Sequence, residues 1–530
     1  MNSSAFTRII ITFAIMILAL WITSDVFGSR SNAIGQFYKY ALISGGILGL
    51  CAPRKGFYLL LFLTGYLDYF KRLMILDTGL SQFDLYYVLG IAPATLAGIC
   101  ATLIYQFVTG GIQHRRWEGR IMVASLGLMG ISAYAALGGG FRAVGDMVNG
   151  VVYLGLLFVM PIMFRTPQEL RHIMKVSILI FIPSVAYYLY QTYAGFTWWE
   201  YQYMIRGYTI EVRQLSERIV RVFGTMNGAG AAVVVYSMQV ALLLFGGFWK
   251  YKDDSGKRTH ASTFARVFLG FFFAWAAYRT FSRAGWIQGL VAAVCFMAFR
   301  SRLMTRAAYI SIAAIILVVV LSSDYVVKHK LLNEWSQDII GTEGSQELHQ
   351  AANLSTFNAR LEGFASLVKD SSLWTPFGIK FAGMRADQVF GNRSFHDAFS
   401  SALIKVGYIP LATVFFLIFL FMRSMHRFIL RQPDGLSATL AAASLSCAVG
   451  IFMGVTHNGA ALMNYPVNFY LYFYLGIVLA LMVYHAEEEY QEKRAAQAAP
   501  PRTSLRNRSQ PYLNEGSRRP LRPERPQLTR

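Results

Sequence analysis

The sequence predicts an all-α, polytopic integral membrane protein. Apolar residues make up 55% of its 530 residues and charged residues only 15%, a balance typical of chains that lie mainly in lipid. The apolar residues gather in runs close to the roughly 17 to 25 residues needed to cross the hydrocarbon core as a helix; about fourteen runs can be marked, or about twelve without the short ones. We therefore expect one membrane domain over residues 1–493 and a separate tail over 494–530.

The net charge of +21 points to membrane lipids rather than to nucleic acid. In a soluble protein, such an excess of Lys and Arg would suggest a nucleic acid partner. In a polytopic membrane protein the same excess is expected in the cytoplasmic loops. We therefore predict no nucleic acid partner.

The N-terminal part contains three predicted spans. The first, Ile9–Phe27, follows a single Arg8 and has no convincing cleavage site, so we keep it as a helix and expect a cytoplasmic N-terminus. Ala41–Cys51 and Phe57–Tyr69 come next, on either side of a basic turn at 53–55. Both runs are short for a crossing, and a single re-entrant hairpin is the alternative.

Basic connectors then alternate with connectors that are poorer in Lys and Arg, which by the positive-inside rule places the basic ones in the cytoplasm. The basic connectors are 113–120, 165–175, 250–266, 300–306 and 423–431. The remaining predicted spans are 86–108, 119–137, 147–164, 174–192, 226–248, 264–280, 283–300, 306–322, 397–422, 437–456 and 465–484. The C-terminus is then cytoplasmic as well.

Two long segments, about 195–225 and 323–395, face the periplasm in this topology. Within the second, Phe357, Leu361, Phe364 and Val368 recur at helical spacing and predict an amphipathic helix on the outer surface. The tail over 494–530 is rich in Arg and Pro and poor in apolar residues. This composition predicts disorder. The alternatives for its role are a solvated tail without a dedicated partner and a tail whose arginines contact anionic lipid.

Arginines on the predicted outer side are the informative charges, because most basic residues are expected on the other side. A guanidinium at a membrane edge is costly unless it is paired, and its planar fork suits a phosphate. Several of them from distant segments predict an anion site; the alternative for each is snorkelling or pairing with Glu217, Glu362 or Asp387. These arginines are Arg218, Arg221, Arg279, Arg283, Arg360, Arg385 and Arg393.

Asn392–Gly407 joins the long polar segment to the next apolar run and puts His396 at a membrane boundary. An imidazole can take up or release a proton near neutral pH, and Arg393 offers a fixed positive charge beside it. The alternative is a histidine that caps the start of a span. His457, in a short outer turn, is a second candidate with the same alternative.

No metal site is predicted. The sequence has no Asp-x-Asp pair, no His/Cys cluster with zinc spacing and no Gly-rich phosphate loop. The cysteines lie within or at the end of predicted spans without CxxC spacing, so we predict buried free thiols. They are Cys51, Cys100, Cys295 and Cys447.

The order of these motifs resembles the O-antigen ligase and polymerase superfamily. In that family an Arg-x-x-Gly stretch followed by Asn opens a span, a Ser-Arg-Gly/Ala turn joins two later spans, an Arg-bearing helix lies in a long periplasmic loop, and a His motif precedes a Gly. The matching residues here are Arg221 to Asn227, Ser282 to Gly285, Arg360, and His396-Asp397 followed by Gly407. The match covers about residues 220 to 410, and Asp397 stands where the family has Asn.

The resemblance implies a bacterial inner-membrane glycosyltransferase with a fold of the GT-C type, which uses a polyprenyl-diphosphate-linked saccharide donor and needs no metal or other cofactor. It implies that Arg221, Arg283 and Arg360 bind the diphosphate and that His396 is the general base. Supporting roles would fall to Arg218, Arg279, Arg393, Asn227 and Asp397. The chemistry is coherent, because fixed guanidiniums stabilise a diphosphate leaving group while a base removes the acceptor proton.

Three functions remain open at this point. The first is a polymerase that joins lipid-linked repeat units into exopolysaccharide or O-antigen, together with other polysaccharide assembly proteins. The second is a ligase that transfers polysaccharide to a lipid A core acceptor. The third is a transporter or flippase of lipid-linked saccharides, which would need broken helices and ionisable groups near the midplane.

Overall fold

The computed structural model describes residues 33–73, 82–111, 115, 117–137, 150–205, 222–226, 228–251, 263–280, 282–299, 307, 373–378, 403–404, 407–454 and 465–498. These residues form helices and no strand, which confirms the all-α prediction. Within them, five helices are long and apolar enough to cross a membrane, and three shorter helices are also apolar. The chain therefore has the helices of a membrane protein, while the full number of spans stays a prediction.

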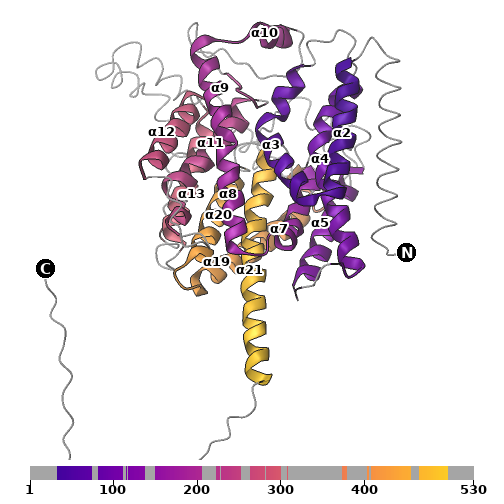
Figure 1. Cartoon of the computed structure of the whole chain (residues 1–530), viewed down its shortest axis with the longest axis vertical. Helices are drawn as coiled ribbons and strands as arrows, with labels where there is room; N and C mark the ends of the chain where they lie inside the picture. Colours follow the sequence, from indigo (N-terminus) through magenta and orange to yellow (C-terminus); the bar gives the residue numbers. More distant parts are fainter. Residues whose placement is uncertain are drawn as a thin grey trace, which may run out of the picture. The chain divides into compact units, whose positions relative to one another are not determined.

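Figure 1 labels the α-helices and colours them in their order along the chain. The described elements are these helices and two short 3-10 helices, η2 and η3, which carry no label in the figure. They are α2 (Ala33–Cys51), α3 (Pro53–Arg72), α4 (Gln82–Val108), α5 (Glu118–Leu137), η2 (Val152–Gly155), α7 (Leu156–Met163), α8 (Pro167–Leu179), α9 (Phe181–Ala194), α10 (Trp198–Ile205), α11 (Ala229–Leu244), η3 (Phe248–Lys250), α12 (Thr263–Arg279), α13 (Arg283–Ala298), α19 (Tyr408–Arg431), α20 (Leu436–Met453) and α21 (Val467–Ala498).

The two short N-terminal runs are parts of longer helices. Helix α2 has 19 residues and α3 has 20, and a rise of about 1.5 Å per residue makes each about 30 Å long. The apolar runs are shorter than the helices because polar residues continue them: Asp68 and Lys71 are buried near the end of α3 and form an ion pair of 3.2 Å. Pro53 starts α3, in the first-turn position where a missing N–H costs nothing.

Helix α8 begins inside a predicted basic connector. Thr166 caps it by accepting a hydrogen bond from the N–H of Glu169 (3.2 Å), and Pro167 follows at the first helical position. Most of the connector 165–175 is therefore helical. Together, α8 and α9 form an apolar helical stretch over Pro167–Ala194.

Helix α19 starts later and ends later than the predicted span 397–422. Leu403 and Ile404 are helical, but Gly407 has a φ of +92° and its N–H ends that turn on the carbonyl of Leu403 at 2.9 Å. Helix α19 begins at Tyr408, whose N–H donates to the carbonyl of Thr375 (3.1 Å). The predicted span missed this interruption because the apolar pattern continues across it.

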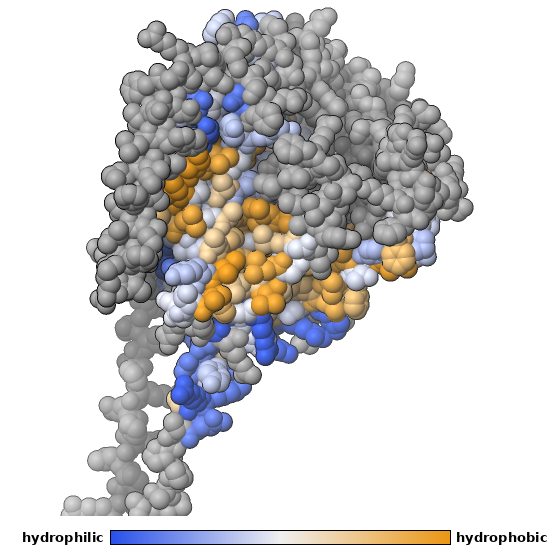
Figure 2. Space-filling model, turned by 90° about the vertical axis from the view of Figure 1, so that its right-hand side faces the viewer, coloured by the Kyte–Doolittle hydropathy of each residue, from blue (hydrophilic) through white to orange (hydrophobic). Residues whose placement is uncertain are grey.

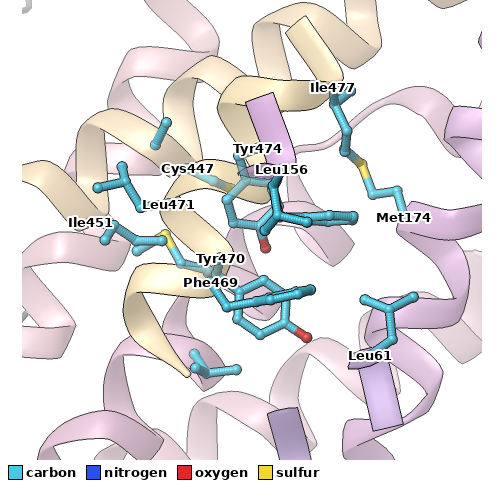
Figure 3. Close-up of a cluster of buried hydrophobic side chains, with 14 of the residues drawn as sticks. Leu61, Leu156, Met174, Cys447, Ile451, Phe469, Tyr470, Leu471, Tyr474 and Ile477 are labelled. Atoms are coloured by element: carbon cyan, nitrogen blue, oxygen red, sulfur yellow. The ribbon is translucent and has the colours of Figure 1, made fainter. Parts of the chain in front are cut away.

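Helix α21 supplies a large share of the core. Its Tyr470, Phe473 and Tyr474 are completely buried, and Thr64 Oγ1 of α3 lies 3.1 Å from the hydroxyl of Tyr470. Figure 3 shows Tyr474 beside Leu156 and Cys447, and Tyr470 facing the side on which Leu61 lies. Helices from both halves of the chain therefore share one apolar core.

Other helices expose apolar side chains in the way expected of a surface in contact with lipid. Phe416 and Phe419 of α19 remain more than half exposed, as do Phe268 and Phe271 of α12. Figure 2 shows hydrophobic residues gathered on another face of the described helices. Among the cysteines, all of which are free, Cys100, Cys295 and Cys447 are buried, but Cys51 is exposed in the last turn of α2, so the prediction of a buried thiol is wrong there.

Several predictions lie outside the described residues: the spans 9–27 and 306–322, the amphipathic helix over 357–370 and the tail after 498. The chain divides into two compact units, Met1–His485 and Ala486–Arg530. The described part of the second unit is helical to Ala498, so α21 includes the first residues of the predicted tail.

Candidate functional site

The basic connectors contact one another at one end of the helices. Arg54 Nη2 lies 2.9 Å from Glu169 Oε1, and Arg165 Nη2 lies 3.5 Å from Glu118 Oε2. These ion pairs join the turn at 53–55 to the connectors 113–120 and 165–175.

The later basic connectors lie at the same end. Arg171 Nη2 donates to the carbonyl of Tyr251 (2.5 Å), and the Tyr251 hydroxyl lies 3.1 Å from Thr439 Oγ1 at the start of α20. The ring of His426 lies 3.2 Å from the carbonyl of Phe299 at the end of α13. We call this the basic end: the described residues of 53–55, 115–120, 165–175, 249–251, 296–299 and 426–431.

Helices α11 and α13 start at the other end, side by side. A Cβ at Gly285 would lie 2.3 Å from Val233 Cγ1, and a Cβ at Gly289 would lie 2.6 Å from Ser237 Cβ. From Gly285 to Gly289 on α13, the contact on α11 also moves forward by four residues, from Val233 to Ser237. The two helices therefore run parallel. Helix α11 ends at Leu244, shortly before residues 249–251 of the basic end, and α13 ends at Ala298 within it. Each helix has 16 residues, so its first turn is about 24 Å from its end.

Helix α19 runs in the opposite direction to α13. Its His426 lies at the end of α13, and its Phe415 ring is 6.1 Å from the Phe452 ring near the end of α20. Gly407, before the start of α19, is therefore far from the basic end. We call this second region the motif end: Arg72, Glu200, Val222–Met226, the first turns of α11 and α13, and Gly407–Tyr408.

The turn Val222–Met226 is held by a fully buried arginine from α3. Arg72 Nη1 donates to Glu200 Oε1 (3.1 Å) and to the carbonyl of Gly224 (2.5 Å), and Nη2 donates to the carbonyl of Met226. The guanidinium carbon lies 4.0 Å from the centre of the Phe223 ring. One side chain thus binds two carbonyls and one ring of the same turn.

Glu200 and Gln191 complete this network. Gln191 Nε2 donates to Glu200 Oε1 (2.6 Å), while its Oε1 accepts from the N–H of Gly224 (2.7 Å). Thr197 donates its N–H and its hydroxyl to Glu200 Oε2 at 3.2 and 2.9 Å. A buried ion pair is tolerated when its remaining hydrogen-bonding positions are filled in this way.

Glycine is the only residue type that fits position 224 of the turn. Its φ is +59°, and a Cβ would lie 2.7 Å from the ring of the buried Tyr188. Thr225 is fixed next to it, since its Oγ1 lies 2.5 Å from Ser184 Oγ, which is 3.0 Å from the Tyr236 hydroxyl. The glycine of the Arg-x-x-Gly motif therefore has a geometric role.

The Ser-Arg-Ala-Gly motif forms the start of α13. Ser282 is the N-cap residue, but its side chain makes no capping hydrogen bond, and Gly228 at the start of α11 has no side chain to make one. Trp286 Nε1 donates to the carbonyl of Ala277 (2.7 Å), which joins α13 to α12. The motif glycine, Gly285, permits the close approach to α11.

Arg279, predicted as a supporting residue, packs on α9. Its guanidinium carbon lies 5.5 Å from the centre of the Tyr193 ring, and the Tyr193 hydroxyl accepts a hydrogen bond from Trp275 Nε1 (2.8 Å). This arginine therefore belongs to the join between α9 and α12 at the motif end.

The other predicted site residues lie outside what the structure describes, apart from the backbone of Arg283, with which α13 begins. They are Arg218, Arg221, Asn227, Arg360, Arg393, His396 and Asp397, together with the side chain of Arg283. The second candidate, His457, and Arg385 are outside it too. Among the described residues, no group of His, Cys, Asp or Glu is arranged to bind a metal ion.

Sequence reasoning missed Arg72, Glu200 and Gln191. Arg72 closely follows a predicted span, and Glu200 stands among aromatic residues in the predicted outer segment 195–225. Each is a charge at a predicted membrane edge, where a charged side chain needs a partner. That need was the signal in the sequence that could have identified both residues. Gln191 carries no signal of that kind, because an uncharged amide near the end of a span needs no ionic partner.

The starts of α11 and α13 bear on the predicted anion site. Two parallel helices direct the positive ends of their dipoles to it, and each starts without a side-chain cap. Arg283 begins one of these helices, and Arg221 precedes the buried turn that leads into the other. In comparison with known proteins, no protein-family model matches the chain, and no curated protein matches it either.

Proposed function

We propose that the chain is a bacterial inner-membrane glycosyltransferase that polymerises polyprenyl-diphosphate-linked oligosaccharide repeat units into exopolysaccharide or O-antigen. The observation that carries the proposal is the parallel packing of α11 and α13. It supports a common position for the two arginine motifs, although more than 50 residues separate them in the sequence. The distance of this position from the basic end supports a periplasmic site.

In the proposed reaction, the acceptor hydroxyl attacks the anomeric carbon of the donor saccharide. His396 accepts the hydroxyl proton as the new glycosidic bond forms. The bond between the anomeric carbon and the diphosphate oxygen breaks, and the polyprenyl diphosphate leaves with the electron pair. Arg221, Arg283 and Arg360 stabilise the negative charge that develops on this leaving group, without a metal ion.

The buried charges at the motif end fit a scaffold better than a transport path. A transporter needs ionisable groups that exchange partners near the midplane. Arg72 and Glu200 instead lie at the ends of their helices and bind backbone groups and each other.

The test is turnover by purified protein supplied with a lipid-linked saccharide. Arg283→Lys keeps the charge but loses the planar fork, so we expect a loss of about 100-fold or more. Arg266→Lys, in α12 near the basic end, is the matched control and should keep normal turnover. Near-normal turnover by Arg283→Lys at equal protein level would contradict the diphosphate role.

The products distinguish polymerase from ligase. A ladder of longer saccharides formed from the lipid-linked donor alone supports the polymerase. Transfer that starts only when lipid A core is added would replace it by the ligase. Movement of the saccharide across vesicles without any new glycosidic bond would overturn both.

A further inference from the structure

We propose that Arg72 is a positioning residue for the donor site. Arg72 fixes the turn Val222–Met226, and thereby the start of α11, beside the first turn of α13. The meaning of "donor" rests on the proposed function, whereas the positioning itself rests on the contacts of Arg72. None of the resembling motifs contains this residue.

The contacts of Arg72 are more than an ion pair requires. Pairing with Glu200 needs one N–H group, yet the guanidinium also binds the carbonyls of Gly224 and Met226 and lies against the Phe223 ring. The turn is held from its other side too, because Gln191 accepts the N–H of Gly224. The backbone therefore has little freedom to shift relative to α3 and α9.

This turn lies within the first arginine motif and leads into α11. Arg221 precedes Val222 directly, and α11 begins at Ala229, two residues after Asn227. Since α11 packs against α13 through Gly285 and Gly289, a turn fixed by Arg72 keeps both arginine motifs in one register. A displacement of about 1 Å at a binding site is enough to cost about 100-fold in rate.

Arg171 provides a matched control. It is also buried, with 2% of its surface exposed against 0% for Arg72, and it also donates to a backbone carbonyl, that of Tyr251. It lies at the basic end, away from the proposed site. A lysine at either position removes a planar fork from a buried site, but only one of the two changes affects the motif end.

The experiment measures steady-state kinetics of the full-length Arg72→Lys and Arg171→Lys proteins with a lipid-linked saccharide. Lysine keeps a positive charge for Glu200 but cannot bind two carbonyls and cover a ring together. We expect the KM for the donor to rise about 10- to 100-fold in Arg72→Lys, with a smaller change in kcat. Arg171→Lys should keep the wild-type KM; a normal KM in Arg72→Lys would overturn the proposal.

A double variant separates positioning from stability. Arg72→Met with Glu200→Met replaces the ion pair by apolar side chains, a change that often preserves folding. The carbonyls of Gly224 and Met226 still lose their partner, so we expect a thermal unfolding temperature below that of wild type but above that of Arg72→Ala, together with a raised KM. A wild-type KM in the double variant would show that Arg72 only stabilises the fold. If none of these proteins accumulates, Gln191→Leu is the replacement, because it removes a single hydrogen bond to the turn. It should give a smaller rise in KM. A wild-type KM in that variant would overturn the proposal.

Hydrogen exchange supplies a measurement that does not depend on the reaction. Amides in peptides that cover residues 222–232 should exchange faster in Arg72→Lys than in wild type or Arg171→Lys. If exchange is faster in Arg72→Lys but the wild-type protein shows no transferase activity, the positioning role stands and the proposed function is refuted. Equal exchange in Arg72→Lys and wild type would overturn the positioning role whatever the activity.

Discussion

The two ends of the described helices use arginine in different ways. At the basic end, Arg54 and Arg165 pair with carboxylates from other connectors, and 65% and 29% of their side-chain areas stay exposed. At the motif end, Arg72 is fully buried and donates hydrogen bonds to two backbone carbonyls. Arg54 and Arg165 also donate to carbonyls, those of Met163 and Ile162, so burial is what distinguishes Arg72 from them. Arg171 is the buried arginine of the basic end, where it binds the carbonyl of Tyr251.

This difference shows that charge alone does not identify a functional arginine. Exposed pairs contribute little to stability, and basic residues at the basic end are expected from the positive-inside rule. A buried guanidinium is costly to desolvate, so its partners reveal what it holds. For Arg72, the two carbonyls and the ring that it contacts belong to the turn within the first arginine motif.

The largest effect is expected for His396. A general base cannot be replaced by an amide, so His396→Gln should lower turnover about 100- to 10,000-fold while donor binding remains. The residual rate should rise with pH if an ionised acceptor partly replaces the base. Turnover of purified variants across pH is the measurement, with His457→Gln as the control. Wild-type turnover by His396→Gln would exclude His396 as the general base and leave only the arginines with a proposed role in the reaction.

The free energy of unfolding should differ between variants of the two ends. Arg72→Ala leaves Glu200 and two carbonyls without their partner and should cost about 3 to 5 kcal/mol. Arg54→Ala removes an exposed ion pair and should cost at most about 1 kcal/mol. Denaturation of the two purified variants against wild type checks both values. Equal losses would mean that the two ends do not differ in the way described.

A smaller effect is expected at Gly407. An alanine there must adopt a positive φ, and its Cβ would lie 2.4 Å from the N of Gly378, so we expect a loss of at least about 2 kcal/mol. Gly110 is the matched control, because it has a φ of +72° but no atom within 4 Å of the added Cβ. Gly110→Ala should cost about 1 kcal/mol. Equal thermal shifts would show that the packing of residues 376–378 on Gly407 contributes nothing.

The positions of several helices were predictable from the sequence, because apolar runs define them. The predicted spans 119–137, 264–280 and 283–300 lie within two residues of α5, α12 and α13 at each end. Boundaries failed where polar residues continue a helix or where tertiary contacts override the apolar pattern. Lys71, paired with Asp68 in the same helix, lies beyond the predicted run of α3, and the contacts of residues 407–409 delay the start of α19.

The site was predictable only in part. The glycines of two motifs, Gly224 and Gly285, have the positions in which a Cβ cannot be accommodated. The Arg72–Glu200 pair was not predictable, since it joins residues 128 positions apart and no local pattern records such a distance. The parallel packing of α11 and α13 is likewise a property of the fold rather than of either segment.

The proposed periplasmic site requires the motif end and the basic end to face opposite sides of the membrane, and labelling can measure this. In a chain whose Cys51 is replaced, Arg283→Cys reports on the motif end and Arg427→Cys on the basic end. A membrane-impermeant maleimide should label position 283 in intact cells and position 427 only after the inner membrane is permeabilised. Labelling of position 283 only after permeabilisation, or of both positions from the same side, would contradict the account.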